Sequence, residues 1–541
     1  MGARGFRARR QDRLRTLLTI SCGGAYLLRT AAIITYDIGT TACKAVVFGV
    51  EGQVLAQAEH EYPVYYPRPL WAEHDPEHWW EAVLLTTHRL REMLDARWDT
   101  LDFAAIGLSS QRETVVPVAR DGTELGRAIL WLDRRSSGQA DELVRVFGRE
   151  RLHQKTGMIP DATFTATKLL WLRQNEPDIF RDAGCFLQPK EFICFKLTGE
   201  RATEPSLASR TMMLDIRTLS WWDEIFDYLG LRPSKFPPIL RSDQAVGGLL
   251  PDAARLLGLP PGIPVAAGGG DRQCEALGAS IFGGRAMEST GTTSNVSYAS
   301  PEVPERLDPR ALCSCHVVQG MWLLEQGLTT TGAILRWFRD QFCADLSAQG
   351  LESGTSAYEL ISRQAGESPP GAKGLLLHPF FMGAKSTRWN PRARGVLFGL
   401  TLNHTRGDVA RAIMEGVAYE IRACFDVLKG MGVMPAEVIL MGGGARARVW
   451  NQIKSDVTGM AFSVPRVTDA ASLGAMILAG TACGALGNPA DASRRLNPIL
   501  EHYSPVRDRS ERYAQLFETY QELYEAVEPL FGRVDNASEG R

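Results

Sequence analysis

Short apolar runs separated by glycine turns begin near residue 31. Residues 33–36 and 45–50 are apolar and β-rich, residues 37–41 between them read as a tight turn, and a third run follows Gly52 at residues 53–60. Runs of this length joined by short turns predict an antiparallel meander of three strands. Such a meander needs helices or further strands to cover its faces.

Helical periods and short strands alternate from there to about residue 260. Apolar positions recur every three or four residues over 77–94 and 168–175, and residues 104–108 form a short apolar strand. This alternation is typical of an α/β fold.

A second unit of strand, turn and strand is predicted at residues 286–299. Its bend contains Gly-Thr-Thr at 291–293, which repeats the Gly-Thr-Thr at 39–41. A tripeptide match is weak by itself, but both copies lie at the bend of a predicted hairpin. We therefore expect two related domains, with a boundary in the proline-rich segment 260–264.

The second half carries its own helices and strands. Thr405 and Asp408 form a capping box, and helical spacing then continues to a stop at Gly430. The remaining elements are a strand at 437–441, a helix at 449–458, a helix of small residues at 470–482 and an amphipathic terminal helix over 513–530. The small residues of the third element suit close packing against another backbone.

Composition narrows the range of partners. Of the 541 residues, 45% are hydrophobic and 23% are charged, and 60 Lys and Arg balance 62 Asp and Glu. The chain therefore has no basic field for nucleic acid or anionic lipid. No uninterrupted apolar run reaches the roughly 18 residues of a membrane-spanning helix. We expect no nucleic-acid partner and no membrane, while a homodimer stays open.

Ten cysteines in a chain of this length are too few for a disulfide framework, so we expect reduced thiols and a cytoplasmic protein. Cys313, Cys315 and His316 form one tight cluster that suggests metal ligands. Because no second ligand pair stands at a usable spacing, buried structural thiols are the better interpretation.

Residues 1–30 differ from the rest of the chain. Six arginines precede a weakly apolar stretch at 17–28, which a cysteine and two glycines interrupt. A targeting peptide is one interpretation, and a disordered extension or over-long start is the one that we prefer.

Two glycine turns flanked by hydroxyl residues are candidate phosphate sites. They comprise Gly39, Thr40 and Thr41, and Gly291, Thr292 and Thr293. Their N–H groups and hydroxyls can bind phosphate oxygens, although ordinary hairpin turns are the alternative for either loop alone. Asp37 stands at a strand end beside the first loop, where a carboxylate is placed to hold a magnesium ion.

Three other segments carry candidate chemistry. Glycines at 268–270 lead to Asp271, a carboxylate placed to accept a proton from an attacking hydroxyl. Glycines at 442–444 offer bare backbone to a nucleotide, without the dinucleotide fingerprint. Gln111, Arg112 and Glu113 follow a strand and can bind the hydroxyls of a small polyol. Trp131 and Asp133 can do the same, and a solvated loop with an internal ion pair is the alternative for this cluster.

Taken together, these segments resemble the FGGY carbohydrate kinases of the actin, sugar kinase and heat-shock-protein ATPase superfamily, over about residues 31–530. Residues 395–400 with 408–415 satisfy the family's C-terminal signature, and residues 165–175 match its N-terminal signature, which fails only at Thr163. The resemblance implies an α/β fold of two ribonuclease-H-like domains with ATP and substrate in a central cleft. The expected divisions are 31–262, 263–500 and a terminal helix and tail at 501–541.

By this resemblance Asp271 is the catalytic base, which removes the proton from the sugar hydroxyl as it attacks the γ-phosphate of ATP. The implied ATP-binding residues are Gly39, Thr40, Thr41, Lys44, Gly291, Thr292, Thr293, Gly442, Gly443, Gly444 and Asn451, with Asp37 for Mg²⁺. The implied substrate-binding residues are Gln111, Arg112, Glu113, Trp131, Asp133, Asp271 and Arg272.

The predicted substrate residues resemble those of two different kinase subgroups. Residues 111–114 are similar to the glycerol kinase loop, but Thr163 replaces an aromatic residue and Arg272 replaces a glutamine of that subgroup. Elsewhere the chain looks more like xylulokinases, although these carry Met-His in place of Arg112 and Glu113. We expect phosphorylation of a small ketose or polyol, first a pentulose such as xylulose. Glycerol and quorum-signalling ketoses are the alternatives, and a non-catalytic sugar sensor on the same fold is the alternative from another class.

Overall fold

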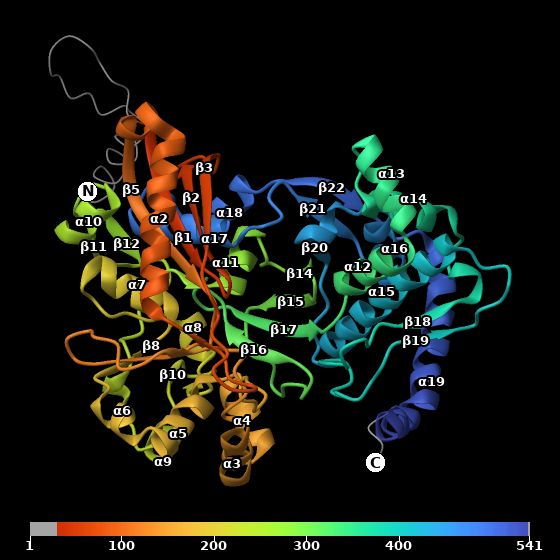
Figure 1. Ribbon diagram of the computed structural model, residues 1–541, viewed down its shortest axis with the longest axis horizontal. Coiled ribbons are helices and arrows are strands. Elements are labelled where there is room, and N and C mark those ends of the chain that lie inside the picture. The colour runs from red at the N-terminus through yellow and green to blue at the C-terminus, as the bar shows by residue number, and fades with distance from the viewer. Residues whose placement is uncertain (1–29, 539–541) are drawn as a thin grey trace, which may run out of the picture.

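Two lobes, each built on a seven-stranded mixed sheet, stand side by side in the computed structural model, which describes residues 30–538 (Figure 1). The predicted N-terminal extension lies outside the described residues, apart from Thr30. The first sheet contains β1 (Thr30–Ile38), β2 (Ala42–Gly49), β3 (Val54–Glu61), β5 (Leu101–Ser110), β11 (Ala245–Gly248), β12 (Pro264–Ala266) and β13 (Gly269–Gly270). The second contains β14 (Arg285–Thr290), β15 (Ser294–Ser300), β16 (Leu312–Cys315), β17 (Trp322–Leu328), β20 (Glu437–Met441), β21 (Phe462–Pro465) and β22 (Ile499–Tyr503).

The predicted meander forms the core of the first sheet. Strand β2 pairs antiparallel with both β1 and β3, and β5 then joins the other edge of β1 in parallel. This register places Asp37 opposite Lys44 on β2 and beside Ser109 on β5. The first turn and the polar end of β5 therefore meet at one edge of the sheet.

The helices of the first half pack partly on that sheet and partly on one another. They are α2 (Pro76–Leu94), α3 (Ser137–Phe147), α4 (Arg149–Thr156), α5 (Thr165–Asn175), α6 (Pro177–Asp182), α7 (Pro189–Thr198), α8 (Pro205–Ser209), α9 (Asp223–Leu229), α10 (Pro251–Leu257) and α11 (Asp271–Gly278). Short ladders join β4 (Glu73–His74) with β7 (Ala128–Ile129), β6 (Val116–Val118) with β8 (Cys185–Leu187), and β9 (Leu214–Asp215) with β10 (Ser220–Trp221). Helix α2 covers the meander by packing on β2 and β3 (Figure 1).

The second half supplies the remaining helices. They are α12 (Gly332–Phe342), α13 (Ala344–Ser353), α14 (Ala357–Glu367), α15 (Arg406–Gly430), α16 (Arg448–Thr458), α17 (Ala471–Ala482), α18 (Pro489–Leu496) and α19 (Arg507–Ser538), with a ladder of β18 (Leu376–His378) and β19 (Val396–Phe398). Helix α15 begins at the predicted capping box, in which both reciprocal hydrogen bonds of Thr405 and Asp408 are present. Helix α19 packs on α15, since Tyr513 and Tyr520 donate hydrogen bonds to Glu415 and Glu420.

The helix of small residues packs closely, as predicted, but on the sheet of the other lobe. Helix α17 lies against β1, β5 and α11. A Cβ on Gly107 of β5 would lie 2.5 Å from the carbonyl oxygen of Ala475, and one on Gly474 would lie 1.9 Å from that of Cys274. Only glycine permits backbones to approach this closely, so these positions fix how α17 joins the lobes.

The sheets do not divide the chain at residue 262. Strands β12 and β13 follow that position, yet both pair with β5 of the first sheet. The proline-rich segment 260–264 therefore does not end the first sheet. The edge of β5 is buried and needs hydrogen-bond partners, and β12 and β13 supply them.

The cysteines that the structure describes lie mainly in the interior. Among the nine that the structure describes, all are unpaired, eight are buried and Cys483 is half-buried. Cys313, Cys315 and His316 form no metal-binding group with other described residues. None of the described helices combines the length and the apolar character that crossing a membrane would require.

Candidate active site

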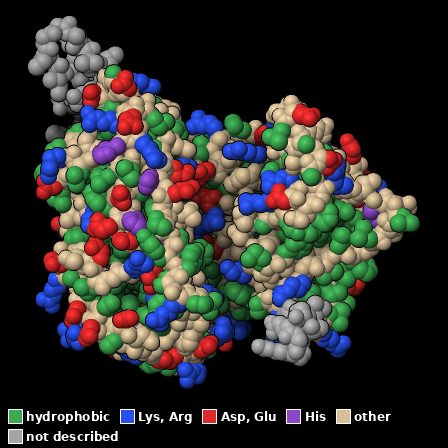
Figure 2. Space-filling model, viewed as in Figure 1, with side chains coloured by type: hydrophobic (Ala, Val, Ile, Leu, Met, Phe, Trp, Pro, Cys, Tyr) green, Lys and Arg blue, Asp and Glu red, His purple; other side chains and the backbone are tan. Residues whose placement is uncertain are grey.

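Charged side chains gather in the hollow between the two lobes (Figure 2). The carboxyl ends of β1, β5 and β13 reach this hollow together, because β1 and β13 both run parallel to β5. Ligands of open α/β sheets bind outside such strand ends. Asp37, the polar residues after β5 and Asp271 after β13 are therefore brought to one place.

The first glycine loop is held by side chains from three directions. Tyr62 and Gln111 donate hydrogen bonds of 2.7 and 2.8 Å to the carbonyl oxygen of Gly39. The indole N–H of Trp131 donates to the Thr40 hydroxyl at 2.9 Å. These hydrogen bonds fix the Gly39 carbonyl group and the Thr40 hydroxyl group in position.

Asp37 is a carboxylate held in an acidic surrounding. Ser109 donates a hydrogen bond of 2.6 Å to its Oδ1. Burial, followed by the nearby charges of Asp271 and Asp469, raises its pKa to about 7 in spite of Ser109 and Lys44. Lys44 itself forms an ion pair with Asp469 of the second half of the chain. A cation beside Asp37 would offset the repulsion between these carboxylates.

Asp271 and Arg112 contact each other at these strand ends. Asp271 begins α11 with 39% of its side chain exposed, and its Oδ1 lies 3.2 Å from Arg112 Nε. The same oxygen accepts a hydrogen bond of 2.7 Å from the backbone N–H of Arg272. A partly exposed carboxylate fixed on one oxygen is suited to accept a proton.

The two predicted nucleotide loops lie side by side in the second lobe. Gly291, Thr292 and Thr293 are exposed at the bend between β14 and β15. A Cβ on Gly442 would lie 2.7 Å from the carbonyl oxygen of Thr290, next to that bend. Gly442 also has φ of 70°, a conformation that favours glycine, so the close approach depends on the bare backbone.

The comparisons with known proteins cover nearly the same part of the chain as this geometry. The models of the N-terminal and C-terminal domains of the FGGY family of carbohydrate kinases match residues 32–278 and 286–483. The chain belongs to this family. It is therefore an ATP-dependent carbohydrate kinase with the two-domain fold of these enzymes, as the sequence predicted.

Individual relatives of this FGGY kinase differ in substrate. The chain is 32% identical to a xylulose kinase of Escherichia coli K12, over 92% of this chain and 99% of that one. It is also 32% identical to a glycerol kinase of Thermococcus onnurineus, over 83% and 89% of the two chains. A solved xylulose kinase structure from Rhodospirillum rubrum superposes with a TM-score of 0.83 at 27% identity, and covers 93% of this chain and 100% of that one.

One predicted substrate residue of the kinase does not reach the hollow. Asp133 is fully buried and accepts hydrogen bonds from Arg135 and from the backbone N–H of Ala72. Its carboxylate is occupied by these internal contacts, and a role in binding substrate hydroxyls stays a prediction. The adjacent Trp131 is 38% exposed, and it contacts the first glycine loop instead.

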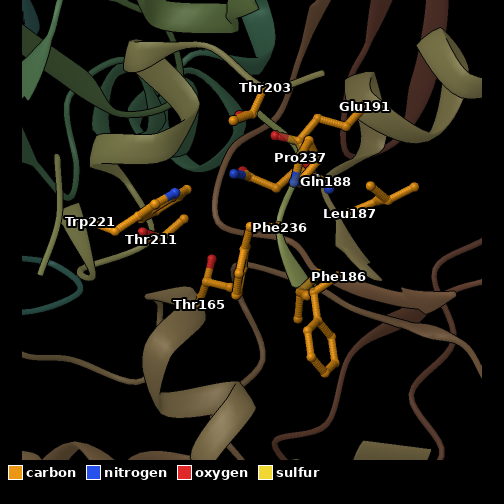
Figure 3. Close-up of a pocket in the computed structure, with 11 residues that line it drawn as sticks. Thr165, Phe186, Leu187, Gln188, Glu191, Thr203, Thr211, Trp221, Phe236 and Pro237 are labelled. Atoms are coloured by element: carbon orange, nitrogen blue, oxygen red, sulfur yellow. Dashed lines mark hydrogen bonds between the residues drawn. The ribbon is translucent and has the colours of Figure 1, made fainter. Parts of the chain in front are cut away.

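Glu113 faces the interior of the first lobe. It has φ of 63°, is 4% exposed and forms an ion pair with Arg210. Gln188 and Thr165 hold its backbone N–H and carbonyl from behind, and both line the small cavity in Figure 3. That cavity has room for roughly one water molecule, which is too little for a sugar. Gln188 and Thr165 therefore support the substrate loop from inside the lobe.

Arg272 and Asn451 are also engaged by protein groups. Arg272 pairs with Glu275 at 2.8 Å, and 31% of its side chain stays exposed. Asn451 is fully buried and donates 2.7 Å to the carbonyl oxygen of Ala445, just after the 442–444 glycines. The structure thus places Asn451 beneath the loop, where it holds the backbone in position.

Several site residues escaped sequence reasoning. Lys454 is fully buried and pairs with Glu288 at 2.6 Å and with the Thr290 hydroxyl at 3.0 Å, so it ties α16 to the end of β14 beside Gly291. Glu325 forms ion pairs with Arg112 and Arg210, and Arg210 forms a second ion pair with Glu113. The signal for Glu325 was a single carboxylate in the apolar run of β17, which a buried strand tolerates only with a charged partner.

Proposed function

We propose that this kinase transfers the γ-phosphoryl group of ATP to a hydroxyl of a small ketose or polyol, with a pentulose of the xylulose type as the first candidate. The observation that carries the proposal is the contact between Asp271 and Arg112 at the strand ends beside Asp37. Phosphoryl transfer depends mainly on positioning and charge neutralisation, and this hollow supplies groups for both.

Asp271 is the general base of the proposed reaction. Its Oδ1 is fixed by Arg112 and the Arg272 N–H, while the side chain stays partly open to the hollow. An attacking sugar hydroxyl that hydrogen-bonds to this carboxylate gives up its proton as its oxygen attacks the γ-phosphorus. Arg112 touches the same carboxylate and would bind a neighbouring hydroxyl.

Asp37 would hold the magnesium ion. Its pKa of about 7 reflects a half-buried carboxylate close to Asp271 and Asp469, and a divalent cation would remove this penalty. Magnesium is usually held by one or two carboxylates together with phosphate oxygens and water. When bound, it would neutralise phosphate charge. The glycine loops at 39–41, 291–293 and 442–444 would bind the phosphates and the adenosine.

Thr163 favours a substrate longer than glycerol. It stands where the glycerol kinase subgroup has an aromatic residue, and its hydroxyl is bound to Asp161 and Arg134. Lys168 bridges the carbonyl oxygens of Thr163 and Glu113, so this position lies next to the substrate loop. A smaller side chain leaves space for additional carbons.

Glycerol is the second candidate. Arg112 and Glu113 are similar to the glycerol kinase pair, and the Thermococcus relative named as a glycerol kinase is 32% identical. The burial of Glu113 beside Arg210 leaves Arg112 as the more accessible member of that pair.

A substrate panel tests the proposal. Sugar-stimulated ADP formation is measured with xylulose, ribulose, erythritol, glycerol and related compounds at saturating Mg-ATP. The proposal predicts the highest kcat/KM for a pentulose. A higher value for glycerol would select the second candidate, and no stimulation by any compound would contradict both.

A further inference from the structure

Glu325 is a buried carboxylate in the middle of β17, on the second lobe. Its strand is paired on both sides, with Ser297 of β15 and Leu312 of β16 opposite Glu325. Only 2% of its side chain is exposed. Because two neighbouring strands hold its backbone, Glu325 is a rigid anchor point.

The partners of Glu325 come mainly from the first lobe. Its carboxylate lies 3.1 Å from Arg112 Nη1 and 3.3 Å from Arg210 Nη1, and it accepts a hydrogen bond of 3.0 Å from Ser314. Burial raises the pKa of Glu325, but Arg112 and Arg210 outweigh this effect and bring the pKa below its ordinary value. The carboxylate is therefore charged and bound by two guanidinium groups.

The side chain of Arg112 is confined by close packing on its way to Glu325. Its side chain lies across Gly270, where a Cβ would be 2.8 Å from Arg112 Cδ and 2.9 Å from Cγ. At the end of this route, Glu325 binds Nη1 and Asp271 lies 3.2 Å from Nε. Gln273 also lies near Nη1, at 3.4 Å, and donates 2.9 Å to Ser314.

Alternating charges connect the two lobes through these contacts. The order is Asp271, Arg112, Glu325, Arg210 and Glu113, each joined to the next by an ion pair. Removing the central carboxylate leaves two buried guanidinium groups without their shared partner, so Arg112 is free to turn away from Asp271.

We propose that Glu325 is a positioning residue that fixes Arg112 against Asp271, and so completes the sugar site from the opposite lobe. This inference rests on the proposed function for its kinetic consequence, but its geometric consequence is independent of any substrate. Sugar binding is thereby coupled to the contact between the lobes.

Kinetics of Glu325→Gln, Arg112→Ala and the double variant test the inference. Glu325→Gln keeps the shape of the side chain and removes its charge. We expect the sugar KM to rise about tenfold, with the ATP KM within about twofold of wild type. In the Arg112→Ala background, Glu325→Gln should add less than about twofold, because the residue through which it acts is gone. Full additivity would overturn the proposal.

Glu415→Gln is the matched control. Glu415 is equally buried in the second lobe and also pairs with an arginine, Arg411 at 2.7 Å, but contacts no residue of the proposed sugar site. It should lower the melting temperature and leave the sugar KM within about twofold. An equal rise of the sugar KM in both variants would assign Glu325 a general structural role and contradict the proposal.

Crystal structures of the wild type and of Glu325→Gln separate this inference from the proposed function. We expect Arg112 Nε to leave Asp271 in the variant, whether or not any panel sugar is phosphorylated. Arg112 remaining at its wild-type position would overturn the inference and leave the proposed function intact. No turnover with any sugar, together with a displaced Arg112, would overturn only the proposed function.

Discussion

Arg112 Nε lies 3.2 Å from Asp271 Oδ1, so the arginine of the substrate loop directly touches the proposed base. The two residues are far apart in the chain and meet because β13 pairs with β5. A hydroxyl bound by Arg112 is consequently placed beside the group that would take its proton. The predictions below follow from this contact and from the packing that supports it.

Replacement of Arg112 should weaken sugar binding selectively. We expect Arg112→Ala to raise the sugar KM at least about tenfold, with the ATP KM within about twofold. Arg112→Lys should restore little, because an ammonium group cannot bind Asp271 and Glu325 through separate nitrogens at a fixed spacing. Initial rates at varied sugar and ATP check this, and an unchanged sugar KM would contradict a role for Arg112 in sugar binding.

Gly270→Ala should displace Arg112 without a large cost in stability. Gly270 has φ of −65° and ψ of 151°, which alanine adopts freely, but its Cβ would lie 2.7 Å from Gln273 Oε1 and 2.8 Å from Arg112 Cδ. We expect the sugar KM to rise about threefold or more, with less than about 1 kcal/mol lost from the free energy of unfolding. Gly138→Ala is the control, since nothing lies within 4 Å of a Cβ there. Equal sugar KM values for both variants would contradict the described route of Arg112.

The contact between α17 and α11 should be sensitive to a single methyl group. A Cβ on Gly474 would lie 1.9 Å from the backbone oxygen of Cys274, and a backbone oxygen cannot move aside as a side chain can. We expect Gly474→Ala to lower the free energy of unfolding by about 2–3 kcal/mol. Gly480→Ala in the same helix meets the movable side chain of Leu486 and should cost less. Urea midpoints compare them, and an equal loss would contradict the reason given.

His378 should make the protein sensitive to acid. The ring is fully buried between aromatic residues, and neither ring nitrogen has a hydrogen-bond partner among the described residues. Burial, with the charge of Arg388, lowers its pKa from 6.5 to about 3. The unfolded chain therefore binds a proton below pH 6.5 that the folded chain excludes, so stability falls as the pH drops from 6.5 toward 3.

His378→Phe removes this proton linkage. At pH 8 we expect a gain of about 1 kcal/mol from removing the unsatisfied nitrogens. The gain should grow by up to about 1.4 kcal/mol for each pH unit below 6.5. Unfolding curves at pH 8, 6 and 5 measure it, and a constant difference between the two proteins would contradict this assignment.

Local signals in the sequence predicted much of the fold. The capping box at Thr405, the meander and the small residues of α17 each depend on neighbours in the chain, and each is present. What the sequence did not show is where α17 docks, because its close contacts with Gly107 and Cys274 join distant segments.

In the candidate site, too, the sequence showed the local motifs but not the contacts between distant segments. Glycine loops and single carboxylates are visible as motifs, and the structure brings Asp37, Arg112 and Asp271 together. Burial is not visible in a motif, so the sequence did not show that Asp133 pairs with Arg135 inside the first lobe. Glu325 was missed because its role depends on a contact between lobes.

The kcat of Asp271→Asn tests the central claim most directly. Asparagine keeps an oxygen for Arg112 and for the Arg272 N–H, but it is too weak a base to accept the sugar proton. With ATP and sugar binding measured by calorimetry, we predict wild-type affinities within about threefold and a kcat at least about a hundredfold lower. A kcat close to that of wild type would contradict the assignment of Asp271 as the base.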